Sequence, residues 1–147
     1  MRNTVHVAAH LFFINDRDEI LLQRRFNTGF HDGLYGLPSG HAEKGETATE
    51  DAIREAFEES NLIVEAKDLS VVHIMYYLKE SAPNDYNCFF LRAMRWHGVP
   101  KIMEPDKCDD LSWFPLKALP DNMIIYIRAA IEDYLKGHFY SEWRNGA

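Results

Sequence analysis

The stretch from Thr47 to Asn61 constrains the fold of this chain most, because it combines clear helix signals with a concentration of negative charge. Thr47 and Glu50 have the spacing of a capping box, in which each side chain hydrogen-bonds the backbone amide of the other residue. Asn61 tolerates the left-handed conformation that often ends a helix. The pattern predicts a helix over 47–61. Its buried stripe is expected to consist of Ile53, Ala56, Phe57 and Ser60.

Glu55, Glu58 and Glu59 would share one face of that helix, because residues three and four apart are neighbours on a helix surface. Like charges at this spacing destabilise an isolated helix by about 0.2–0.5 kcal/mol per pair. A divalent cation would remove this repulsion, and Mg²⁺ prefers carboxylate and phosphate oxygens as ligands. The alternative is a solvated acidic face, which is the usual origin of a run of charges.

The rest of the chain alternates between strand and helix patterns. Residues rich in β-branched and aromatic side chains predict strands over 5–14, 20–25, 71–78, 86–94 and 111–114. The turn residues 15–18 favour a hairpin between the first two strands. An amphipathic helix is predicted over 123–136. This order indicates an α+β fold with a mixed sheet between helices, and we expect one domain over residues 1–147.

Charge and composition exclude several classes of function. The chain has 16 basic and 23 acidic residues and a formal charge of -7, which argues against binding to nucleic acid polymers or anionic membranes. No apolar run approaches the roughly 20 residues that span a bilayer. The N-terminus lacks the apolar core of a signal peptide. Cys88 and Cys108 lack metal-ligand spacing, so we expect free thiols in a reducing, cytoplasmic compartment.

The charged positions around the first helix follow a known pattern. Gly40 is followed after five residues by Glu46, and after seven more by the segment 54–62, which reads REAFEESNL. This resembles the Nudix box, GX5EX7REUXEEXGU, in which U is a bulky apolar residue. Asn61 replaces the closing glycine, and Ala56 is a small residue at a bulky position. The segments 34–40, 96–100 and 111–115 also resemble landmarks of MutT-like members.

The resemblance implies an α/β/α sandwich and hydrolysis of a diphosphate linkage with the help of Mg²⁺, or alternatively Mn²⁺. It implies that Glu58 and Glu59 are metal ligands and that Glu55 is a ligand or the general base. The carbonyl of Ser39 matches the backbone ligand that precedes the box. For Arg54 the alternatives are a role in orienting Glu58 and an exposed helix ion pair.

Further site residues are predicted with an alternative for each. Glu104 matches a loop glutamate that serves as base or metal ligand in MutT-like enzymes, or it is an ordinary loop carboxylate. Arg24 and Arg25 have the chemistry to hold phosphate, or they are surface residues. Asn122 matches an asparagine that reads a purine edge, or it caps the last helix.

These features predict a nucleotide substrate. The leading interpretation is conversion of a nucleoside triphosphate to a monophosphate and pyrophosphate. The alternatives are a hydrolase of nucleoside diphosphate sugars or dinucleotides, and a catalytically idle domain that only binds nucleotides. A homodimer is also expected, because dimers are common in the family that the chain resembles.

Overall fold

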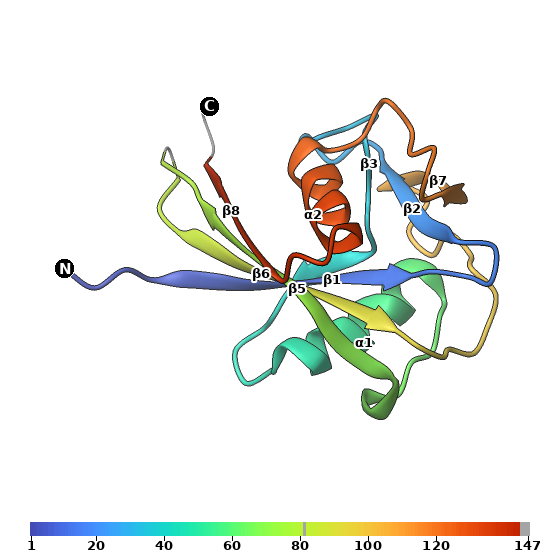
Figure 1. Cartoon of the computed structure of the whole chain (residues 1–147), viewed down its shortest axis with the longest axis horizontal. Helices are drawn as coiled ribbons and strands as arrows, with labels where there is room; N and C mark the ends of the chain where they lie inside the picture. Colours follow the sequence, from blue (N-terminus) through green and yellow to red (C-terminus); the bar gives the residue numbers. More distant parts are fainter. Residues whose placement is uncertain (81, 145–147) are drawn as a thin grey trace.

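The computed structural model describes residues 1–80 and 82–144. Its elements are β1 (Val5–Phe13), β2 (Glu19–Arg25), β3 (Tyr35–Gly36), β4 (Ser39–His41), α1 (Ala48–Ser60), the 3-10 helix η1 (Ala66–Asp68), β5 (Leu69–Leu78), β6 (Asp85–Ala93), β7 (Cys108–Pro115), α2 (Ile125–Leu135) and β8 (Tyr140–Arg144). The strands form a five-stranded sheet in the order β4-β1-β6-β5-β8 and a three-stranded sheet in the order β3-β2-β7. The helices α1 and α2 lie on opposite sides of β1 (Figure 1).

The larger sheet is mixed, as predicted. Strand β1 runs parallel to β6 and antiparallel to β4, and β5 runs antiparallel to β6 and parallel to β8. Together with the two helices this confirms the α+β class and the α/β/α arrangement. The single domain and the homodimer stay predictions.

The hairpin predicted between the first two strands is wrong. Strand β1 belongs to the larger sheet and β2 to the smaller one, and a single antiparallel bridge between Ile14 and Ile20 joins their ends. The long-range partners outcompete the local pairing, since β1 matches β6 along its whole length from Val5 to Phe13. The turn at 15–18 is closed by the Asn15 amide, which donates to the Glu19 carbonyl at 2.9 Å, but the two strands then enter different sheets and form no extended hairpin.

Strand β1 supplies both hydrophobic cores. Ala8 and Phe12 pack in the core that includes Ile127 of α2. Leu11 and Phe13 pack in the second core, which includes the α1 residue Ala56. Successive side chains of a strand point to opposite faces, so burial on both faces explains why β1 is apolar along most of its length. The sheet therefore separates the α1 face from the α2 face.

The helix α1 begins and ends as predicted, but its buried stripe differs. Thr47 caps the helix in a complete capping box, and Asn61 ends it with a φ of 65°. The buried residues are Asp51, Ala52, Ala56 and Ser60, while Phe57 is 48% exposed and Ile53 is only partly buried. Small side chains at these positions let the helix approach the sheet closely, and the larger apolar residues turn outward.

The left-handed residue at the end of α1 leads to a first prediction. Replacing Asn61 with Gly should change the free energy of unfolding by less than about 0.5 kcal/mol, because glycine adopts this conformation freely. Replacing it with Ala should cost about 1 kcal/mol, since the Cβ of alanine is strained at positive φ. Urea unfolding of both variants measures the difference. Equal stability of the two variants would show that the conformation of Asn61 contributes nothing.

The second helix and three short strands depart from the sequence prediction in detail. Helix α2 starts after Ile124, so the predicted start at 123 and the interpretation of Asn122 as its cap are wrong. Strands β3, β4 and β8 were not predicted, because two to five residues carry too little periodicity.

Cys88 and Cys108 are free and buried. In the described ranges, no helix is long and apolar enough to cross a membrane.

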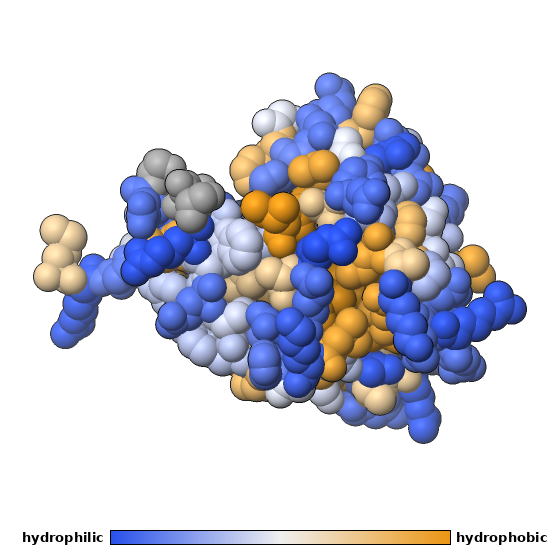
Figure 2. Space-filling model, turned by 45° about the horizontal axis from the view of Figure 1, so that its top comes forward, coloured by the Kyte–Doolittle hydropathy of each residue, from blue (hydrophilic) through white to orange (hydrophobic). Residues whose placement is uncertain are grey.

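Apolar side chains also reach the surface. Figure 2 shows hydrophobic residues gathered over the middle of one face, with hydrophilic residues on both sides. Large apolar residues with at least half of their area exposed include Ile63, Val99, Ile125 and Phe139. These residues come from different elements, and scattered exposed apolar residues are ordinary for a folded domain.

Candidate functional site

A cavity of about 340 Å³ lies beside the sheet-facing side of α1. The side chains of Glu55, Glu58 and Glu59 enter it from the helix. The remaining lining residues come from β2 and the loop after it, from β4, and from the segment 104–108. They are Gln23, Arg24, Arg25, Thr28, Ser39, Gly40, Glu104, Lys107 and Cys108. Elements far apart in the sequence therefore bring four carboxylates and three basic side chains to one cavity.

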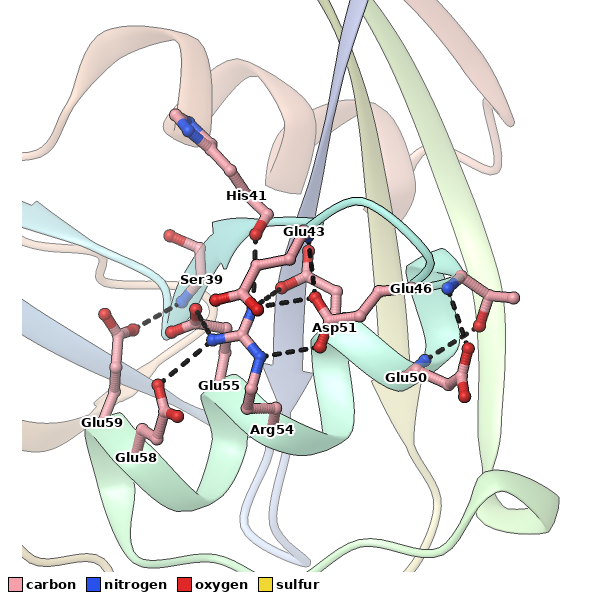
Figure 3. Close-up of polar contacts among 11 residues, drawn as sticks. Ser39, His41, Glu43, Glu46, Glu50, Asp51, Arg54, Glu55, Glu58 and Glu59 are labelled. Atoms are coloured by element: carbon pink, nitrogen blue, oxygen red, sulfur yellow. Dashed lines mark hydrogen bonds and ion pairs between the residues drawn. The ribbon is translucent and has the colours of Figure 1, made fainter.

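Arg54 is the electrostatic centre of the helix face. Its Nε donates to Glu46 Oε2 at 2.7 Å, and its Nη2 contacts Asp51 Oδ1 at 3.1 Å. Its Nη1 donates to Glu55 Oε1 at 2.8 Å and to Glu58 Oε2 at 3.2 Å. Figure 3 shows these four carboxylates converging on the guanidinium. The contact with Glu58 agrees with the predicted positioning role, but Arg54 holds a network and not one isolated pair.

Arg54 lowers the pKa of both Glu46 and Asp51, but the net shifts of the two carboxyl groups are opposite. The hydrogen bond from Arg54 lowers the pKa of Glu46 to about 2, so Glu46 stays ionised. Burial raises the pKa of Asp51 to about 6, although Arg54 opposes the shift. Asp51 is fully buried, and its second oxygen has no hydrogen-bond partner in the described part of the chain. Neither residue lines the cavity, which favours structural roles for both.

Glu59 is held against the strand that precedes the helix. Its Oε1 accepts hydrogen bonds from the Ser39 amide at 2.7 Å and from Gln23 Nε2 at 3.1 Å. Burial raises the pKa of Glu59 to about 8, because these two neutral donors only partly replace water. The Ser39 amide thus fixes the position of the Glu59 carboxylate, and both residues line the cavity.

Glu55 lies directly over Gly40. A Cβ at position 40 would come within 2.2 Å of the Glu55 carboxyl carbon, so the absence of a side chain there creates the space for the carboxylate. Burial raises the pKa of Glu55 to about 7, and Arg54 opposes this shift. The leading glycine of the motif is therefore explained by packing against a charged side chain of the same motif.

This contact gives a second prediction. Gly40→Ala should displace the Glu55 carboxylate and lower kcat about 10- to 100-fold, the effect typical of misplacing a group near a metal ligand. The fold should survive, because the clashing atoms are the end of a flexible side chain. Steady-state kinetics and thermal unfolding measure both quantities.

Gly45→Ala is the matched control for this prediction. Gly45 lies in the loop between β4 and α1, with a φ of 93° and no atom within 4 Å of an added Cβ. The control strains the backbone without reaching the carboxylates, so it should retain activity. A Gly40→Ala enzyme as active as the control would contradict the proposed role of Gly40.

The other predicted residues are distributed unevenly. Arg24, Arg25 and Glu104 line the cavity, and Arg24 also pairs with Asp109 at 2.7 Å. Asn122 is not among the lining residues of this cavity, and its side chain donates to the carbonyl of Gly33 at 3.1 Å. Its role in reading a purine stays a prediction.

Sequence reasoning missed Gln23 and Lys107. Both line the cavity, and Gln23 also hydrogen-bonds Glu59. Only the spacing of Lys107 three residues after Glu104 could have pointed to it. The position of Gln23 on a strand carried no signal, because an amide on a strand is more often a surface group.

The donor set suits a hard divalent cation. Glu55, Glu58, Glu59 and the backbone oxygen of Ser39 are all oxygen donors, as Mg²⁺ and Mn²⁺ prefer. Glu55 and Glu59 are partly buried and have raised pKa values, so a bound cation would compensate negative charge that the protein itself compensates only in part. Across the described ranges, no group of three or more His, Cys, Asp or Glu side chains is arranged to hold a metal ion, and Arg54 engages Glu55 and Glu58.

A family model described as the NUDIX domain matches residues 4–134. An ADP-ribose pyrophosphatase of Methanocaldococcus jannaschii is 29% identical over 97% of this chain and 78% of that protein. An NAD-capped RNA hydrolase of Pseudomonas putida is 33% identical over 70% of this chain and 34% of that protein.

Other curated relatives are longer than this chain. A nucleoside triphosphate pyrophosphatase/Nudix hydrolase fusion protein of Bifidobacterium longum is 27% identical, and the match covers 72% of this chain and 21% of that protein. The chain thus spans well under half the length of this relative and of the RNA hydrolase.

Solved structures with a similar fold include proteins described as MutT. A MutT NUDIX hydrolase from Burkholderia pseudomallei superimposes with a TM-score of 0.79 at 25% identity, covering 88% of this chain and 98% of that one. A MutT protein from Methanosarcina mazei has a TM-score of 0.75 at 17% identity and shares the fold, covering 92% and 96% of the two chains.

Proposed function

Since the chain belongs to the NUDIX family, we propose that it is a divalent-cation-dependent hydrolase that cleaves the diphosphate linkage of a nucleoside diphosphate-X compound. The observation that carries the proposal is the cavity itself. Glu55, Glu58 and Glu59 share it with Arg24 and Lys107, so it combines cation-binding oxygens with cations that attract phosphate.

Within this class, a nucleoside triphosphate converted to a monophosphate and pyrophosphate is the first candidate. The similarity to structures described as MutT proteins supports it, because they match this chain over nearly their full length. The excess of acidic over basic residues supports a small substrate over a nucleic acid polymer.

The proposed mechanism assigns a task to each group in the cavity. Glu58, Glu59 and the Ser39 carbonyl would hold Mg²⁺ or Mn²⁺, which when bound neutralises phosphate charge and activates water. Arg24, Arg25 and Lys107 bind and orient the phosphates through charge-assisted hydrogen bonds. Arg54 keeps Glu58 and Glu55 in place, and Gln23 and the Ser39 amide do the same for Glu59.

The proton acceptor is one of two carboxylates in the same cavity, Glu55 or Glu104. Glu55 is fixed by Arg54 and by its packing on Gly40. Glu104 comes from a turn in which its carbonyl accepts from the Lys107 and Cys108 amides. The pH–rate profiles of Glu55→Gln and Glu104→Gln identify the base, because its removal abolishes the acid-side limb of the profile.

One relative favours a second candidate substrate. The match to the protein described as an ADP-ribose pyrophosphatase covers 97% of this chain and 78% of that protein. A nucleoside diphosphate sugar is therefore the alternative within the proposed class.

A substrate panel with Mg²⁺ tests the function. Purified protein is incubated with nucleoside triphosphates, ADP-ribose and NAD, and pyrophosphate and phosphate are measured with and without added phosphatase. Direct release of pyrophosphate from a triphosphate supports the first candidate. A signal that appears only after phosphatase treatment of ADP-ribose or NAD supports the second. Absence of turnover across the panel, with nucleotide binding retained, would favour the idle domain.

A further inference from the structure

A second cavity of about 470 Å³ adjoins the first on the α2 face of the sheet. The two cavities share Arg25, Ser39 and Gly40, so one ligand can extend from the carboxylates into the second cavity. Its walls are rich in rings from β5, β6, α2 and the loop after β2. These are Tyr77, Tyr86, Tyr126 and Phe30.

The side chain of Lys79 brings a positive charge to this cavity. Its Nζ lies 4.4 Å from the centroid of the Tyr86 ring, 5.0 Å from that of Tyr77 and 5.6 Å from that of Phe30. Over residues 1–80 and 82–144, no hydrogen bond or ion pair engages this Nζ with another residue. An ammonium carries three donors, so the side chain has unused hydrogen-bonding capacity inside an aromatic-walled cavity.

The other groups of the cavity reinforce its donor character. Neither Asp nor Glu is among the described residues that line it, in contrast to the neighbouring cavity with its four glutamates. Arg25 adds a second cation at the shared boundary. Burial lowers the pKa of His10 to about 3 and also lowers that of His41, so both rings are neutral near pH 7.

From this arrangement we propose that Lys79 is a specificity-determining residue that donates to a keto oxygen on the nucleobase of the substrate. The proposal rests on the proposed function, because it takes the diphosphate to lie at the carboxylates. The ring of the base occupies the aromatic-walled cavity, and its oxygen-bearing edge meets the Lys79 ammonium.

The chemistry selects keto over amino bases. Hypoxanthine and guanine present O6 and N7 as adjacent acceptors, and uracil presents O4, whereas adenine and cytosine place an amino donor at that edge. An amino group opposite an ammonium puts two donors together, and adenine then offers only N7 where guanine offers both N7 and O6 as acceptors. Lys79 therefore disfavours the amino bases through this mismatch, while stacking on the rings accepts every base.

The test compares binding of nucleoside monophosphates, which are not hydrolysed. Calorimetry measures Kd for IMP against AMP and for UMP against CMP. Wild type should bind the keto member of each pair about tenfold more tightly, the scale of one well-placed base contact. Lys79→Met should reduce both ratios to about one by weakening IMP and UMP, since methionine keeps the stem on the aromatic rings and removes the ammonium.

Lys67→Met is the matched control. Lys67 is an exposed lysine on η1 that pairs only with Glu65 among described residues, and it lies outside the cavity. Its loss removes the same charge from the protein and should leave both ratios unchanged. Lys79→Gln serves as a second variant if the methionine protein is unstable.

Three results would overturn the proposal: no keto preference in wild type, a preference that survives in Lys79→Met, or no binding of any of the four monophosphates. The outcome is separable from that of the hydrolysis panel. The protein could turn over none of the panel substrates and still show a keto preference that Lys79→Met removes. This result would contradict the proposed function and leave the base-binding inference intact.

Discussion

Glu58→Gln should lower kcat by on the order of 10²–10³-fold while leaving the melting temperature unchanged. Glu58 is 50% exposed, and its only side-chain hydrogen bond in the described structure is the 3.2 Å bond from Arg54, which a glutamine oxygen also accepts. The change therefore removes one negative charge from the proposed cation site and little packing. Steady-state kinetics over a Mg²⁺ titration, with thermal unfolding on the same samples, separates the two effects.

The control for this prediction is Glu65→Gln. Glu65 is 58% exposed and pairs with Lys67 at 3.3 Å, outside the cavity. The Glu65→Gln substitution removes the same charge from a similarly exposed position and should leave kcat unchanged. Full turnover by Glu58→Gln would contradict the assignment of Glu58 as a ligand, and a large fall in its melting temperature would show that its role is structural.

Arg54→Ala should destabilise the domain and also remove most activity. Removing one partner of a fully buried ion pair costs about 3–5 kcal/mol, and partial solvent access reduces this to about 2–3 kcal/mol. Arg54 is 25% exposed, and its loss leaves Glu46, Asp51, Glu55 and Glu58 without their shared cation. Urea unfolding measures the loss of stability, and kinetics measures the effect of releasing Glu55 and Glu58.

The stability loss in this variant should depend on pH. Burial already raises the pKa of Asp51 to about 6 and that of Glu55 to about 7, and Arg54 opposes both shifts. Without Arg54 these values rise further above the unfolded-state values. A raised carboxyl pKa contributes stability that is present at low pH and lost as the pH rises through it. The gap between wild type and Arg54→Ala should therefore be smaller at pH 5 than at pH 8.

Arg54→Lys distinguishes charge from geometry in the same network. Lysine keeps the positive charge but cannot form the forked contacts that reach four carboxylates at once. It should recover part of the stability and less of the activity. Equal stability of Arg54→Ala and wild type at pH 8 would mean that the network contributes nothing to folding.

Local sequence information predicted the helix α1 well. The capping box at Thr47 and the left-handed Asn61 act within a few residues of each other, so their spacing specifies the helix ends without reference to the rest of the chain. The i, i+3 and i+4 spacing of Glu55, Glu58 and Glu59 likewise predicted that they share one helix face, and all three line one cavity. The family pattern added their chemical meaning.

The buried stripe of α1 and the pairing of β1 show where local patterns fail. Hydrophobicity favoured Phe57, but the close approach of α1 to the sheet selects small residues such as Ala52 and Ala56 for the contact. The turn residues favoured a hairpin, but β1 finds its long partner in β6 some eighty residues away in sequence. Both outcomes depend on competing long-range contacts, and a sequence window does not contain them.

The helix, its caps, the row of carboxylates and the α+β class can be predicted from the sequence, because each follows from interactions between near neighbours or from the order of elements. Tertiary packing brings Gln23 and Lys107 to those carboxylates and places Glu55 over Gly40. It also placed Lys79 among aromatic rings beside the same cavity. The physical reason is that a cavity exists only where distant segments pack together, so its lining has no period or spacing along the chain.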